Sequence, residues 1–346
     1  MTGSDNSAAS DDGAFAGTLP TNMLCGLLQE ARLRGINPDP WFAGLRVSAA
    51  EIQDVRARVS YRQASEIVRR AVRMLPEDIG LELGRRQNGG NFGLLGLAMK
   101  TSRDFAQAVA IGLEFQRNQG PLMELRMQHD AGADSVAILA HAPESQQDLL
   151  PFLCEEMFAS LLMLGRDLAG PGLAPKRVEL AYPAPPYQQK YAALFECEVV
   201  FNQPRNALLL DRQWLSLQFP SYNPVASQHA LAMCRAHQPS DRHDGEYTTA
   251  VERYLRRHLR ENPTMQEVAA HLHLSERNLR RRLGNEDTRF SAVHDRIRTE
   301  QALQMLQNSE DSIAHIGVLV GFNDAREFRR AFKRWTGTTP SQARGR

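Results

Sequence analysis

The segment NDAREFRRAFKRW, residues 323–335, combines five cationic and three large aromatic side chains. On an α-helix, positions i, i+3, i+4 and i+7 share one face. One face then carries the apolar residues Phe328, Ala331, Phe332 and Trp335. A different face carries the basic residues Arg326, Arg329, Arg330 and Lys333. The segment therefore predicts a helix that buries one side in a core and presents cations on another.

Two stretches, residues 263–283 and 311–332, match one helix-turn-helix pattern. In each, a helix with inward apolar residues is followed by a short turn and a second helix. A small residue, Ala269 or Gly317, stands where the two helices touch. The expected N-caps of the second helices, Ser275 and Asn323, stand 48 residues apart. One helical hairpin is a common feature, but two in tandem indicate a DNA-binding domain.

The outward faces of the two second helices hold the candidate DNA contacts. Arginine forks pair with guanine O6 and N7 or with phosphates. The candidates are Arg277, Asn278, Arg280 and Arg281 on the first helix, and Arg326, Glu327, Arg329 and Arg330 on the second. A joining helix over residues 290–308 spans about 28 Å at ~1.5 Å per residue. Half-sites one DNA turn apart are ~34–36 Å from each other, so the pattern predicts two recognition helices in successive major grooves of double-stranded DNA.

Charge is distributed unevenly along the 346 residues. The whole chain has a net charge of only +1. Residues 247–346 hold 18 Lys and Arg against 12 Asp and Glu, a net of +6, so the remainder carries −5. Such an asymmetry indicates that the basic part meets a polyanion. RNA is the weaker candidate, because the deep, narrow major groove of an A-form helix resists a protein helix.

The chain divides into four predicted regions. Residues 1–16 are small, polar and acidic, which is typical of a disordered tail. Residues 17–236 mix helices first with strand-like runs later, which predicts an α+β domain. Residues 237–246 form a polar linker, and residues 247–346 predict an all-α domain with two helix-turn-helix motifs. No apolar run approaches the ~20 residues that span a bilayer, and no secretion signal opens the chain, so we expect a cytoplasmic protein.

The C-terminal hundred residues resemble the DNA-binding domain of the AraC/XylS family of bacterial transcription factors. The resemblance lies in EVAAHLHLSERNLRRRL and in the signature GFxDxxxFxRAFKRWxGxxPSxxR, here Gly321 to Arg344. The family favours Gly where His273 stands and Ala where Gly317 stands. Because glycine in a helix costs up to about 1 kcal/mol relative to alanine, we expect the second hairpin to be slightly looser.

The N-terminal domain resembles the branch of that family with an ornithine-utilisation-regulator-type, or arabinose-binding-like, domain. The matching segments are NFGLLGLAMKTSRDFAQAV and YAALFECEVVFNQPRNALLLD. That branch usually has Gly, Pro and Tyr where this chain has Glu196, Glu198 and Leu97. The resemblance implies a homodimeric regulator, more often an activator, that acts with RNA polymerase at promoter DNA and senses a small effector.

Catalysis and metal binding are disfavoured by the motifs. The chain lacks G-x-S-x-G, H-E-x-x-H and P-loop patterns. Cys154 has two acidic neighbours, which disfavour a reactive thiolate. His271 and His273 are two residues apart and point to different sides of a helix. We therefore expect no enzyme, no metal site and no cofactor.

The sequence leaves open whether a small effector controls the protein. Eight apolar residues are candidates to line a pocket, although each of them can equally form ordinary core: Phe92, Leu94, Leu95, Leu122, Phe152, Met157, Phe158 and Leu161. The alternative is a regulator without a small ligand, controlled by its abundance or by a protein partner. A preformed cavity would favour the effector, because small-ligand pockets usually exist before the ligand binds.

Overall fold

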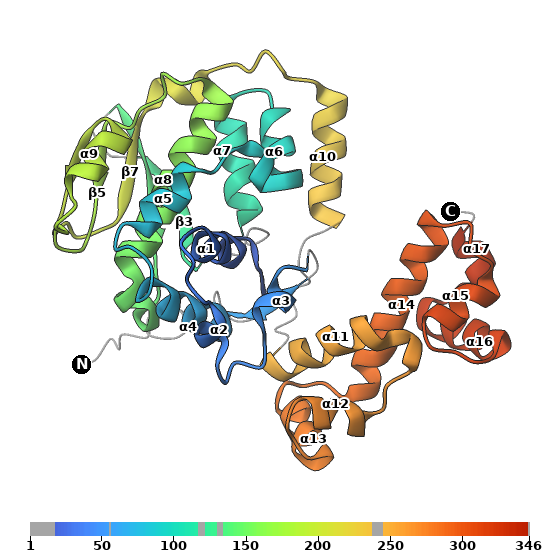
Figure 1. Ribbon diagram of the computed structural model, residues 1–346. Helices are drawn as coiled ribbons and strands as arrows, with labels where there is room; N and C mark the ends of the chain where they lie inside the picture. The colour runs from blue at the N-terminus through green and yellow to red at the C-terminus, as the bar shows by residue number, and fades with distance from the viewer. Residues whose placement is uncertain (1–17, 55–56, 117–121, 130–133, 237–244, 345–346) are drawn as a thin grey trace, which may run out of the picture. The chain divides into compact units, whose positions relative to one another are not determined.

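A computed structural model describes residues 18–54, 57–116, 122–129, 134–236 and 245–344 (Figure 1). Two compact units divide the chain, Met1–Arg56 with Tyr61–Arg242, and Ala57–Ser60 with His243–Arg346. The predicted tail and residues 237–244 of the predicted linker lie outside the described residues. The four domain bounds therefore stay a prediction.

The N-terminal unit contains a five-stranded sheet with the order β3-β4-β7-β5-β6. All neighbours are antiparallel except β5 and β6, which are parallel. Val136 of β4 pairs with Leu210 of β7. The strands are β3 (Glu124–His129), β4 (Ser135–His141), β5 (Arg177–Glu179), β6 (Glu198–Val200) and β7 (Ala207–Asp211). The sheet strands lie in the later part of residues 17–236, where the sequence predicts strand-like runs, so the α+β assignment is confirmed.

Helices surround this sheet in the N-terminal unit (Figure 1). The longest is α8, Leu150–Ala169, and eleven of its twenty residues are buried. The others are α1 (Asn22–Leu33), α2 (Asp39–Phe42), α3 (Ala49–Ile52), α4 (Tyr61–Val72), α5 (Ile79–Arg85), α6 (Gly93–Lys100), α7 (Phe105–Glu114), α9 (Gln189–Phe195) and α10 (Pro224–Ala236). The short strand β1 (Thr18–Pro20) and the 3-10 segments Gly89–Phe92, Glu144–Leu149 and Arg212–Ser216 also belong to this unit. The short strand β2 (Arg58–Ser60) is grouped with the C-terminal unit.

Two glycines let α5 lie unusually close to α8. A Cβ at Gly84 would stand 2.6 Å from the carbonyl oxygen of Glu156. A Cβ at Gly80 would stand 2.7 Å from the carbonyl oxygen of Phe152. No side chain fits at such distances, so these positions require glycine. The close contact fixes α8 and the direction in which its polar residues point.

The C-terminal unit is helical apart from its loops and the short segment at residues 57–60. Its elements are α11 (Glu246–His258), a 3-10 turn (Leu259–Glu261), α12 (Met265–His271), α13 (Glu276–Asn285), α14 (Phe290–Asn308), α15 (Ile313–Leu319), α16 (Ala325–Thr336) and α17 (Pro340–Arg344). One apolar core joins these helices, with Val251, Leu279, Ile297 and Phe328 completely buried. The long helix begins and ends where the sequence predicts, at Phe290 and Asn308.

Candidate nucleic-acid interface and ligand cavity

The first helix-turn-helix consists of α12 and α13. Thr264 and Glu267 form a reciprocal capping box at the start of α12. Ser275 caps α13 as predicted, because its hydroxyl oxygen accepts a hydrogen bond from the backbone N–H of Asn278 at 3.3 Å. Leu279 and Leu283 face the core. With its inner face anchored, α13 directs its other residues outward.

All four predicted contact residues of α13 are exposed. They are Arg277, Asn278, Arg280 and Arg281. Arg280 is held by Glu276, one turn earlier, with a nitrogen–oxygen distance of 2.5 Å. Among the described residues, the guanidinium groups of Arg277 and Arg281 make no ion pair. This face therefore offers cations, at Arg277 and Arg281, that no carboxylate in the described part of the chain neutralises.

The second helix-turn-helix consists of α15 and α16. Ser312 caps α15, because its hydroxyl oxygen accepts a hydrogen bond from the backbone N–H of His315 at 3.1 Å. The prediction that Asn323 caps α16 is wrong. Asp324 caps it, and its carboxylate accepts from the N–H of Arg326 at 2.8 Å. A carboxylate also suits this place better than an amide, because the N-terminal end of a helix carries partial positive charge.

The faces of α16 are divided as the opening segment predicts. Phe328, Ala331 and Phe332 are buried, and Trp335 is half-buried against the same core. A Cβ at Gly317 of α15 would stand 3.2 Å from atoms of the Phe328 side chain. The glycine therefore lets the two helices of this hairpin approach closely. The exposed side holds the four predicted contact residues: Arg326, Glu327, Arg329 and Arg330.

A half-buried arginine of α14, Arg298, holds the turn of the second hairpin. Arg298 donates from Nε to the carbonyl oxygen of Val320 at 3.1 Å and from a terminal nitrogen to that of Gly321 at 3.3 Å. The same terminal nitrogen donates to Asn262 at 2.5 Å. Its guanidinium lies over the ring of Phe322 at 4.5 Å. The fork thus satisfies carbonyls at the end of α15 and sets the angle at which α16 follows.

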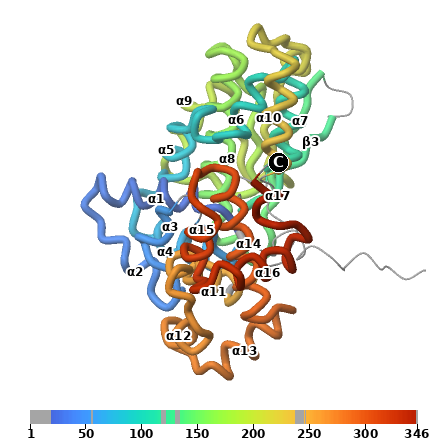
Figure 2. The backbone as a smooth tube through the Cα atoms, turned by 90° about the vertical axis from the view of Figure 1, so that its right-hand side faces the viewer, coloured from blue at the N-terminus to red at the C-terminus, as the bar shows by residue number. Residues whose placement is uncertain are grey.

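The joining helix places the two hairpins at opposite ends of the unit. Figure 2 shows α12 and α13 at one end and α15, α16 and α17 at the other, with α14 running between them. At ~1.5 Å per residue, the nineteen residues of α14 extend about 28 Å. Both arginine-bearing helices keep an exposed face. The unit therefore presents two separate basic surfaces, one on each hairpin.

A buried histidine of α14 makes this unit sensitive to acid. Burial, reinforced by the positive charge of Arg298, lowers the pKa of His294 from 6.5 to about 4, whereas Asp295 acts in the opposite direction. Because the folded pKa is depressed, the unfolded chain binds the proton more readily. Stability linked to His294 is therefore present above pH 6.5 and is lost as the pH falls towards 4.

We accordingly expect the urea midpoint of the C-terminal unit to fall between pH 7 and pH 5, and the fall to be smaller in His294→Gln. Carboxylates contribute to both curves, so the difference between the variant and the parent is the relevant quantity. The exposed His315 of α15 provides the control, as His315→Gln. Equal pH dependence in the parent and His294→Gln would contradict the assignment.

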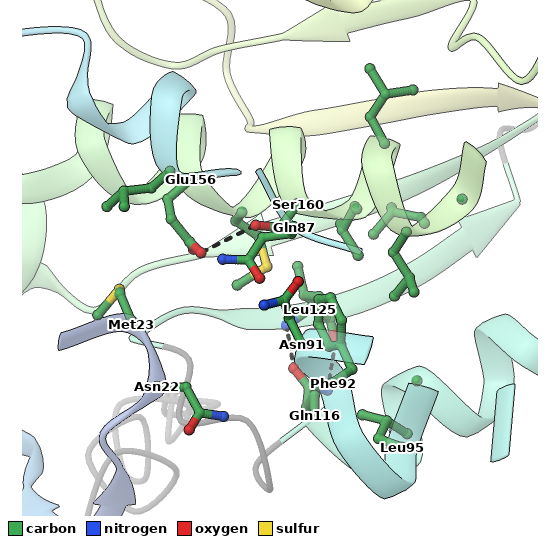
Figure 3. Close-up of a pocket in the computed structure, with 18 of the residues that line it drawn as sticks. Asn22, Met23, Gln87, Asn91, Phe92, Leu95, Gln116, Leu125, Glu156 and Ser160 are labelled. Atoms are coloured by element: carbon green, nitrogen blue, oxygen red, sulfur yellow. Dashed lines mark hydrogen bonds between the residues drawn. The ribbon is translucent and has the colours of Figure 1, made fainter. Parts of the chain in front are cut away.

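The N-terminal unit contains a cavity of about 610 Å³. Residues of α8, the sheet and the helices around them line it, and polar side chains gather on one part of the wall (Figure 3). Of the eight residues predicted to line a pocket, five do: Phe92, Leu95, Leu122, Met157 and Leu161. Phe152 and Phe158 are buried core, and Leu94 is half-buried outside the lining. This volume lies in the range of small-molecule sites, ~300–1,000 Å³.

The sequence prediction did not include the polar part of the cavity wall. Glu156 and Ser160, one turn apart on α8, face it, and the Ser160 hydroxyl donates to Glu156 Oε1 at 3.1 Å. Gln116 is fixed by its hydrogen bonds to the backbone of Leu113 and Leu125. The usable signal was the pair of glutamates in the otherwise apolar stretch FLCEEMF.

Two known protein families match this chain. The family described as "Arabinose-binding domain of AraC transcription regulator, N-term" matches residues 35–219, and a helix-turn-helix domain family matches residues 268–346. The ornithine utilization regulator of Pseudomonas aeruginosa is 30% identical over 90% of this chain and 91% of its own length. The chain belongs to the AraC family of transcriptional regulators.

Two further regulators align over nearly the whole chain. An uncharacterised helix-turn-helix regulator of Mycobacterium tuberculosis is 28% identical over 93% of this chain and 94% of its own length. The crystal structure of the regulator CdpR from Pseudomonas aeruginosa covers 94% of this chain and 98% of its own, with 20% identity and a TM-score of 0.46. The family consists of DNA-binding regulators, so the expectation that this chain is not an enzyme is confirmed.

Two residues of this AraC-family chain that stand where the sequence resemblance implies glycine lie on left-handed backbone. His273, in the turn of the first hairpin, has φ +55°, and Glu196, which ends α9, has φ +55°. Both stand where the family favours glycine, the residue that adopts this conformation without steric penalty. Glu196 also pairs with Arg166 at 3.0 Å. The turns thus keep their geometry with side chains in place of glycine.

The described parts of this regulator can be checked for a reactive thiol, a metal site and a membrane-spanning helix. Burial raises the pKa of the Cys154 thiol well above its usual range. Groups of three or more His, Cys, Asp and Glu residues able to hold a metal are absent from the described ranges. Within those ranges, no helix combines the length and the apolar character needed to cross a membrane.

Proposed function

We propose that this AraC-type regulator binds promoter DNA through both hairpins at once, with α13 and α16 in successive major grooves on one face of the duplex. The observation that carries the proposal is the exposure of all eight predicted contact residues, four on each helix. The buried apolar residues of the same two helices, Leu279 and Leu283 on α13 and Phe328 and Phe332 on α16, belong to one core. Arginine at such positions pairs with guanine edges or phosphates.

The role of the N-terminal unit is the second part of the proposal. A cavity of about 610 Å³ with apolar walls and a few polar groups fits gating by a small effector. The protein then acts in the cytoplasm as a homodimer that favours paired sites, and as an activator in contact with RNA polymerase. Control by abundance or by a protein partner is the competing mechanism, and the cavity favours the effector.

Mapping of bound sites across the genome, followed by hydroxyl-radical footprinting of a purified site, tests the DNA-binding part. We expect each chain to protect two segments about 10 base pairs apart on one face of the duplex. Protection of one segment only, or of none at low ionic strength, would refute the two-helix arrangement. Reporter transcription from the mapped promoters separates activation from repression.

Binding is also expected to weaken steeply with salt. Each phosphate that an arginine neutralises releases bound counterions, so the slope of log K against log salt approaches about −0.9 per phosphate contact. With six or more such contacts, raising salt from 50 to 200 mM lowers affinity about 10³-fold. Fluorescence anisotropy on a mapped site measures the slope, and a flat salt dependence would contradict recognition by these arginine faces.

A further inference from the structure

The cavity of the N-terminal unit contains a carboxylate that has no cationic partner among the residues that the structure describes. Glu156 lies on the central helix α8 and its side chain projects towards the cavity (Figure 3). Its only partner among the described residues is Ser160, whose hydroxyl donates to Oε1 at 3.1 Å. Oε2 is left without a protein donor in that part of the chain. Carboxylates in such sites ordinarily have a cation or several donors.

The other charges of the wall already balance one another. Arg86 is the sole cation among the described lining residues, and it pairs with Glu30 and with Glu82. Glu30, almost completely buried, is paired with Arg34 as well. These two arginines and two glutamates form a neutral group. Among the described lining residues, the charge that remains is that of Glu156.

Burial makes this carboxylate responsive to what the cavity contains. Desolvation raises the pKa of Glu156 to about 7, and the hydrogen bond from Ser160 opposes that rise. Near neutral pH the protonated and the charged forms of Glu156 are therefore both populated. A ligand cation beside it would favour the charged form and expel the proton, whereas a ligand carboxylate would meet repulsion.

We propose that the cavity binds a monocationic organic amine, with its ammonium group on Glu156 and its apolar part against the leucines of the wall. The inference rests on the proposed effector control and names the ligand class for that site. The apolar part would lie among residues such as Leu95, Leu125 and Leu161. Gln116, whose amide is engaged by the backbone, supports the wall rather than the ligand.

A matched set of probes tests the ligand class on the full-length protein: 2-phenylethylamine, 2-phenylethanol and 3-phenylpropanoate, with hexylamine, 1-hexanol and hexanoate as a second series. Calorimetry and thermal shift measure binding at pH 6 and pH 8. We expect each amine to bind about tenfold more tightly than its alcohol at pH 8. The amine advantage should shrink at pH 6, where Glu156 is protonated, and the alcohol should bind equally at both.

Titration in two buffers of different ionisation enthalpy adds an independent readout, because amine binding should release a proton at pH 7. Glu156→Gln should abolish both the amine preference and the proton release while the alcohol still binds, which shows that the variant is folded. The control variant is Glu144→Gln, which removes one negative charge from an exposed residue outside the cavity lining. It should keep the amine preference and the proton release of the parent.

The outcomes separate this inference from the proposed function. Tighter binding of the carboxylates, or amines no better than alcohols, would overturn the ligand class while leaving an effector cavity in place. Failure of all six probes would overturn the ligand class as well, and DNA binding would be untouched. Loss of DNA binding in the footprint would refute the regulator's proposed mode of action without bearing on the probes.

Discussion

Replacing Phe328 with alanine should unfold the second hairpin. The Phe328 side chain is completely buried, and its ring lies 5.7 Å from the rings of both Phe322 and Phe332. Because Gly317 has no Cβ, the backbone of α15 can approach this ring closely. Truncation to alanine removes the ring and leaves a cavity, which costs about 3–5 kcal/mol in a core of this kind. The hairpin then loses the residue that joins α16 to α15.

The measurement is the thermal transition of the C-terminal unit together with hydrogen exchange in α15 and α16. At about 4–8 °C per kcal/mol for a domain of this size, Phe328→Ala should lower the transition by roughly 12 °C or more. The exposed neighbour Glu327 gives the control, because Glu327→Ala should change stability by less than about 0.5 kcal/mol. An unaltered transition in Phe328→Ala would show that this residue is not core.

Removing one arginine from each hairpin should abolish most specific DNA binding. Arg281 and Arg330 are exposed on α13 and α16 and belong to the predicted contact set. Loss of a bidentate contact to guanine costs about 1–3 kcal/mol. The two residues lie on different hairpins, so their effects should add. The double variant Arg281→Ala with Arg330→Ala should bind a mapped site about 2–6 kcal/mol more weakly.

Gel shifts on the mapped site and on a scrambled duplex measure that loss. If the arginines read bases, specific affinity falls further than affinity for the scrambled duplex. If they only contact phosphate, both fall together and the salt slope decreases by about one for each arginine. Arg85→Ala, an exposed arginine in the N-terminal unit, controls for the change in charge. Unchanged affinity in the double variant would defeat the assignment of both faces.

Local chemistry explains why the recognition elements could be predicted from the sequence. The period of Phe328, Ala331 and Phe332 identifies the buried side of α16 without any knowledge of its partners. Ser275 and Ser312 cap their helices because their hydroxyls bond to backbone N–H groups three residues later. The wrong cap at Asn323 was an error of one residue, since Asn323 and Asp324 are both of a type that caps helices and the backbone conformation of the turn places Asp324 at the cap.

Features that depend on residues far apart in the chain could not be predicted from the sequence. The clamp of Arg298 on the turn at Val320 and Gly321 joins residues more than twenty positions apart. The apolar residues expected in a pocket were divided between cavity and core by the packing of α8, because apolarity alone does not say which side of a helix faces empty space.

Amino-acid order alone determined the family, the two hairpins and their outward arginines, because helix period, capping and turn chemistry act over a few neighbouring residues. Only the tertiary structure decided that Glu156 faces a cavity in which Arg86 is already paired. The reason is physical: the charge and solvation of a buried group are set by atoms that folding brings beside it, and those atoms belong to helices far apart in the chain.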